Sequence, residues 1–123
     1  MNRNVLDYFG KLLMSGVRDE TITNWDMIVN GEMKGITAQQ VREKISSFSE
    51  EQIEVLKWLI SKVTDSCLHN ILITIEKNDE LKVTISDGQI DTNIKQISDG
   101  LEGELYTEDG WITRFSKKRY DEI

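Results

Sequence analysis

The acidic and aromatic residues near the C-terminal end are the side chains of this sequence best suited to binding. Residues 79 to 109 hold nine acidic residues and two basic ones, and nine minus two equals the whole formal excess of seven negative charges in the chain. Carboxylates around an aromatic anchor can steer a basic protein to an interface in which that anchor is buried. We expect a partner-binding surface made of Glu102, Glu104, Tyr106, Glu108, Asp109 and Trp111.

His69, the single histidine, provides a second candidate site. It lies four residues after Asp65, so on a helix the two side chains share a face and could act as an oriented acid–base pair, although ordinary surface ion pairs have the same spacing. A hydrolytic triad also needs a nucleophile, and Cys67 points about 200° away around the helix. Cys67 falls on an apolar stripe, where a free cysteine packs as a small buried hydrophobe. We therefore expect no catalytic residues.

Metals, nucleic acids and membranes do not fit the residue patterns. The acidic segment that begins at Asp87 lacks the acid-x-acid-x-acid order of a calcium loop, and one cysteine with one histidine makes no zinc ligand set. A pI of about 4.7 opposes binding to nucleic acid or anionic membranes, which needs clustered basic residues. No apolar run approaches the roughly 18 residues of a membrane span, and the N-terminus shows no signal-peptide pattern. We expect no metal or other cofactor, and a cytoplasmic location, which the lone cysteine also favours.

Two capping-box patterns mark predicted helix starts. Thr37 and Ser49 are each followed three positions later by a glutamine, so that side chain and backbone can satisfy each other's hydrogen bonds. They predict a short helix near 37–46 and a long helix from about 49 to 77. On the long helix an apolar stripe recurs at steps of three and four, and this stripe is the predicted core face. Its members are Ile53, Leu56, Ile60, Val63, Cys67, Ile71 and Ile75, and it is broadened by Leu59, Leu68 and Leu72.

The two ends of the chain carry weaker signals. The apolar pattern predicts a helix over 4–15 that stops at Gly16, and a second helix around Trp25 that is capped by Thr21 or Thr23. Residues 70–77 also alternate as a strand would, and the alternative is a hairpin with residues 81–85. Three Asp-Gly pairs after position 86 predict turns between short strands, with a final helical turn near 112–116.

These elements predict an α+β fold in a single domain, 1–123. The N-terminal two thirds are mainly helical around the long central helix at about 49–77, and a small β-rich C-terminal part packs on that helix. Trp58 flanks the predicted stripe, where we expect it to pack against the core.

The C-terminal segment also shows a resemblance. Ser98–Tyr106, Glu108–Ile112 and Phe115–Ser116 resemble the signature SDGLxGELYxEDGWIxxFS of an uncharacterised family of small bacterial cytosolic proteins. Leu68–Asn70 and Glu76 extend the resemblance to the long helix. The resemblance implies a bacterial source, and it implies no reaction.

We therefore expect a non-enzymatic, acidic protein-binding domain, with an immunity-type inhibitor of a basic partner protein as its specific form. One alternative is an enzyme or small-ligand protein that uses His69 with Asp65. Another is a scaffolding subunit of a homo-oligomer, with an apolar patch at Trp25 or Trp58. The oligomeric state that we expect is a monomer or a small homo-oligomer.

Overall fold

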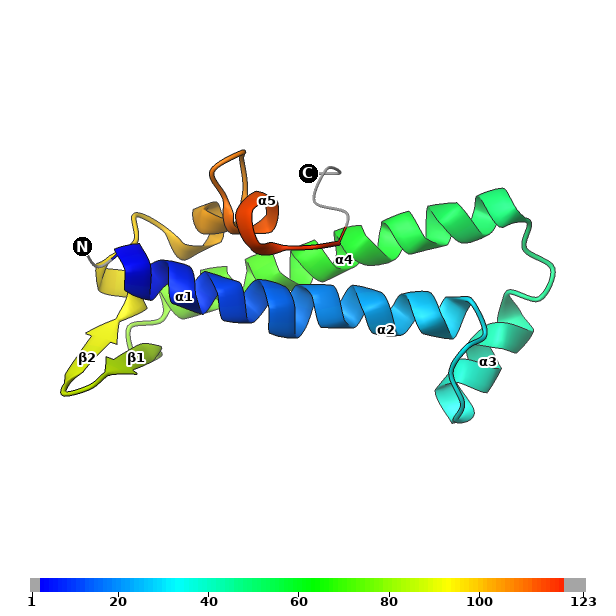
Figure 1. The fold of residues 1–123 in the computed structure, drawn as a ribbon, viewed down its shortest axis with the longest axis horizontal. Coiled ribbons are helices and arrows are strands. Elements are labelled where there is room, and N and C mark those ends of the chain that lie inside the picture. The colour runs from blue at the N-terminus through cyan, green and yellow to red at the C-terminus, as the bar shows by residue number, and fades with distance from the viewer. Residues whose placement is uncertain (1–2, 119–123) are drawn as a thin grey trace.

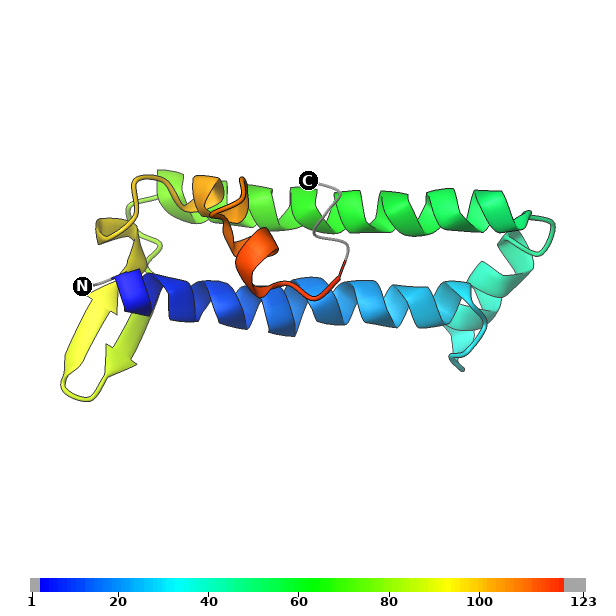
Figure 2. The same cartoon turned by 45° about the horizontal axis from the view of Figure 1, so that its top comes forward.

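A computed structural model describes residues 3–118 of the chain. Two long antiparallel helical rods dominate it (Figure 1). The first rod is continuous from α1 (Arg3–Leu13) through a π-helical segment, η1 (Met14–Asp19), to α2 (Glu20–Val29). The second rod is α4 (Glu50–Lys77), and the short helix α3 (Ile36–Lys44) joins the two at one end. The rotated view in Figure 2 shows the two rods side by side along most of their length.

The first rod does not stop at Gly16, so the prediction of two separate helices is wrong. The residues that it buries include Leu6, Gly10, Met14, Arg18 and Ile22, at steps of four. A step of four residues overshoots the 3.6-residue turn of an α-helix, and the wider turns of the π segment bring the buried face back into phase. Burial of this face outweighs the roughly 0.5–1 kcal/mol that glycine costs inside a helix. The predicted threonine caps lie within the continuous rod and cap nothing.

One of the two predicted capping boxes forms. The backbone N–H of Gln52 donates to Ser49 Oγ at 3.2 Å, and the backbone N–H of Ser49 donates to Gln52 Oε1 at 2.8 Å. The box predicted at Thr37 is wrong, because α3 begins one residue before it and Gly35 is the N-cap. Gly35 has a φ of 116°, and its carbonyl already accepts the N–H of Gln39, so the helix starts without a side-chain cap.

The long helix is confirmed, but only part of the predicted stripe is buried. Residue 77 ends α4, so the alternative hairpin over 70–77 does not form. Leu68 and Leu72, which broaden the stripe, are buried in the core, whereas Val63 and Ile71 on the stripe itself are 53% and 54% exposed. Apolar residues surround much of α4, so their periodicity indicates a helix without selecting the side that its neighbours cover. Trp58 is 47% exposed, and its predicted packing against the core is wrong.

The C-terminal part holds a small antiparallel sheet followed by short helical turns. Strands β1 (Thr84–Asp87) and β2 (Ile90–Asn93) pair with Asp87 opposite Ile90, and Gly88 takes a φ of 65° in the turn between them. The sheet and the long helix confirm the α+β class. The turns that follow the sheet are η2 (Ile94–Gln96), η3 (Leu101–Leu105) and α5 (Trp111–Phe115).

The core lies where these C-terminal turns cover α1 and the C-terminal half of α4. Leu101, Leu105, Trp111 and Ile112 are buried there against residues of both rods. Trp111 sits on Gly10, where a Cβ would come 2.5 Å from the indole ring. The other half of the two-rod layer, between α2 and the start of α4, has less cover, as both views show (Figures 1 and 2).

Candidate functional site

A polar hollow of about 440 Å³ lies between α4 and η3. His69 faces it from α4, and the remaining lining comes from the segment around η3, which begins after Gly100. Tyr106 Oη lies 3.0 Å from His69 Nδ1. Burial raises the pKa of Tyr106, and the negative charge of Asp65 raises it further, so the hydroxyl stays protonated. The lining residues are His69, Asp99, Gly100, Glu102, Gly103, Glu104 and Tyr106.

The two glutamates of the hollow differ in their partners. Glu104 accepts a hydrogen bond from Arg3 at 2.8 Å and another from Ser98 Oγ at 2.9 Å, so its charge is compensated within the fold. Glu102 Oε2 is buried and has no hydrogen-bond partner in the structure. A buried carboxylate oxygen without a partner is energetically unfavourable, since its lost hydration is not replaced. The hollow therefore contains one acceptor whose bonding capacity is unused.

The other predicted binding residues occupy two different environments. Glu108 and Asp109 are exposed on the loop between η3 and α5. In that loop Thr107 has a φ of 73°, and a Cβ at Gly110 would come 2.1 Å from the Tyr106 carbonyl oxygen, so the turn is tight. Trp111, in contrast, is 0% exposed. Its indole belongs to the core and is not accessible to a partner, because the last turns of the chain fold back over α1.

The proposed pairing of Asp65 with His69 does not form. Asp65 accepts two hydrogen bonds from Arg18, from Nε at 2.6 Å and from Nη2 at 3.2 Å, while His69 meets Tyr106 instead. Arg18 is completely buried and also donates to Ser116 Oγ at 2.8 Å. This ion pair links α4 to the first rod. Sequence spacing could not reveal it, because its two members lie 47 positions apart.

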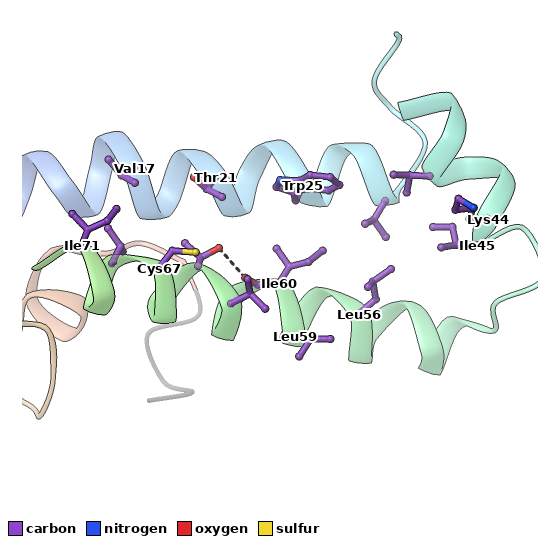
Figure 3. Close-up of a pocket in the computed structure, with 15 residues that line it drawn as sticks. Val17, Thr21, Trp25, Lys44, Ile45, Leu56, Leu59, Ile60, Cys67 and Ile71 are labelled. Atoms are coloured by element: carbon purple, nitrogen blue, oxygen red, sulfur yellow. Dashed lines mark hydrogen bonds between the residues drawn. The ribbon is translucent and has the colours of Figure 1, made fainter. Parts of the chain in front are cut away.

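A second, larger hollow has a different chemistry. This apolar groove of about 540 Å³ runs between α2, α3 and α4, and it is lined mostly by aliphatic side chains together with the indole of Trp25 (Figure 3). Cys67, predicted to be buried, is exposed along it. The sequence patterns did not lead to a prediction of this groove, although the unusual width of the apolar arc on α4 could have indicated it. Its lining is Val17, Thr21, Trp25, Val29, Val41, Lys44, Ile45, Leu56, Leu59, Ile60, Val63, Thr64, Cys67, Leu68 and Ile71.

No protein-family model, curated protein or solved structure matches this chain. Within residues 3–118, no three His, Cys, Asp or Glu side chains gather closely enough to hold a metal ion. No helix in this described range combines the length and the apolar character that a membrane crossing requires. The functional inference therefore rests on the polar hollow and the apolar groove.

Proposed function

We propose that this chain is a non-enzymatic binding protein that receives a basic side chain of a partner protein in the polar hollow beside η3. The unpartnered Glu102 Oε2 carries this proposal. A guanidinium or ammonium group in the hollow would supply the missing donor once the carboxylate turns about its terminal torsion, which is a soft rotation. The resulting charge-assisted hydrogen bond is worth about 1.5–3 kcal/mol.

The neighbouring groups favour a cation over an anion. Asp99 adds a third carboxylate to the two glutamates of the lining, and Tyr106 adds a hydroxyl that is already bonded to His69. Since Arg3 pairs with Glu104, Asp99 and Glu102 are the lining carboxylates that form no salt bridge within residues 3–118. Arginine suits such a site better than lysine, because its planar fork donates to two acceptors at once.

Exposed carboxylates around the hollow support the choice of a protein partner. Asp99, Glu108 and Asp109 are exposed near it, and Asp87 and Asp91 are exposed on the β1–β2 hairpin. The elements that carry them gather at the same end of the two rods (Figure 1). The negative electrostatic field of these carboxylates accelerates the encounter with a basic protein surface. At physiological salt this field is screened over a Debye length of about 8 Å.

Inhibition of a basic toxin is the specific form of this proposal. An inhibitor of this immunity type needs a surface that is complementary to the toxin. In this role the carboxylates would cover the basic residues with which the toxin binds its own substrate.

The test compares two substitutions that remove the same charge. Binding of a fluorescent hexa-arginine peptide is measured by anisotropy for the unchanged chain, for Glu102→Gln and for Glu20→Gln, whose side chain is exposed on α2. We expect Glu102→Gln to weaken binding about tenfold, the lower limit of a charge-assisted bond, and Glu20→Gln to weaken it far less. Equal losses for the two variants, or no binding by the unchanged chain, would reject the hollow as the site.

A further inference from the structure

The apolar groove belongs to a larger apolar face on α4. Leu56 and Leu59 line the groove on one side, and the same two residues line a second hollow of about 520 Å³ that extends to Phe48 and Val55. Leu59 is 47% exposed and Val55 is 61% exposed. We call the groove, the second hollow and the ridge of Leu56 and Leu59 between them the apolar face.

The extent of the apolar face indicates a macromolecular occupant. A small molecule in the groove would cover Ile60 and Val63 but would leave Val55 and the outer side of Leu59 in water. Contiguous apolar patches of this kind on monomeric proteins usually mark interaction sites. A second protein surface can cover the ridge and both of its flanks at once.

The relief of the apolar face has the projection and the depressions that a twofold contact requires. A twofold interface requires one patch to carry both a projection and the depression that receives it. Here the Leu56 and Leu59 ridge lies directly between two hollows of similar size, about 540 and 520 Å³. The ridge of one copy can therefore enter a hollow of the other while the reverse contact forms by symmetry.

The charge distribution favours the same occupant. The whole excess of seven negative charges lies in residues 79–109, whereas the lining of the apolar face includes only Lys44 and Glu51 as charged side chains. Two copies that meet through this face thus bring little like charge together. With the twofold axis across α4, the two helices run antiparallel, and the acidic ends point in opposite directions.

The size of the apolar face is close to what a stable dimer needs. From Gln52 to Ile71 it follows 20 residues of α4, which is about 30 Å at 1.5 Å per residue. Two packed helices are about 20 Å wide, so the face presents an area on the order of 600 Å² in projection. A standard interface buries about 800 Å² of accessible surface per partner. Because the accessible surface of a face is larger than its projected area, the apolar face is close to this size.

We propose that the apolar face is the interface of a twofold homodimer, in which α2 and α4 of two copies form an antiparallel four-helix bundle. The bundle would bury the apolar residues of α4 that one copy leaves exposed. This proposal is independent of the polar hollow, which shares no lining residue with the apolar face.

The experiment measures molar mass by light scattering during size-exclusion chromatography of the full chain. We expect twice the chain mass of 14.2 kDa at roughly 100 µM, a hundredfold above a micromolar dissociation constant. Leu59→Glu and Val63→Glu each place a charge on the apolar face at an exposed position and should give the mass of one chain. Ile90→Glu is the matched control, since it makes the same kind of change at a 68% exposed residue on the hairpin and should leave the dimer intact.

Circular dichroism of each variant verifies that the helices remain. The dimer should also persist in 1 M salt, where the Debye length of about 3 Å suppresses surface electrostatics. A single-chain mass for the unchanged protein would overturn the proposal. So would a dimer that Leu59→Glu and Val63→Glu leave intact, or one that Ile90→Glu dissociates.

Discussion

The buried ion pair between Arg18 and Asp65 allows a quantitative test of how the two rods are held together. Arg18 is 0% exposed and the Asp65 side chain is 10% exposed, so each group depends on the other for its charge compensation. We consider Arg18→Met and Asp65→Leu, singly and together. Both replacements keep much of the side-chain volume and remove the charge.

The expected energies follow from the burial of the pair. Either single substitution leaves one charge buried without its counterion, and this destabilises a fold by about 3–5 kcal/mol. The double substitution leaves no unpaired charge, and replacing a buried ion pair with apolar residues is often neutral or stabilising by about 1–4 kcal/mol. Against a total stability of about 6–18 kcal/mol for 123 residues, the single variants should lose a large share of their stability.

Urea unfolding, followed by circular dichroism, measures these free energies. We expect both single variants to unfold at much lower urea than the unchanged chain, and the double variant to unfold near it with a similar slope. Lys34→Met, at an exposed position in the loop before α3, serves as the control and should change stability by no more than about 0.5 kcal/mol. If the double variant lost the sum of the two single losses, the two residues would not be coupled.

Two further predictions concern the packing of the first rod. Gly10→Ala places a Cβ 2.5 Å from the Trp111 ring, and the overpacking cost of about 1–3 kcal/mol should outweigh the gain of up to about 1 kcal/mol in helix propensity. Gly16→Ala brings its Cβ within 4 Å of no other atom, so this variant should stabilise the fold. The urea midpoints of the two variants test both expectations. The hydrogen bond from Arg114 holds the pKa of Asp7 below its ordinary value of 3.8. The stability that Asp7 contributes relative to Asp7→Asn should therefore be fully present above that value and disappear as the pH falls through the lower pKa of the folded state, and a difference that stays constant in acid would contradict this account.

Several features of the candidate site were predictable from the sequence and others were not. The confinement of the charge excess follows from counting, and it directs attention to the segment that forms the polar hollow. The unpartnered Glu102 oxygen and the contact between His69 and Tyr106 arise only when η3 packs on α4. His69 and Tyr106 lie 37 positions apart in the sequence, so no local pattern connects them. The burial of Trp111 was likewise not predictable from the sequence, because an aromatic residue among acidic residues fits both an exposed binding anchor and a core residue.

By itself the sequence determined the local elements: the long helix up to residue 77, the capping box at Ser49 and the turn at Gly88. Hydrogen bonds among near neighbours and backbone preferences decide these features, and both depend on residues that lie close together in the sequence. Only the tertiary structure decided which face of α4 is buried, that the first rod passes through Gly16, and that Asp65 binds Arg18. These outcomes depend on contacts between distant segments, whose combined burial outweighs the small local preferences of single residues.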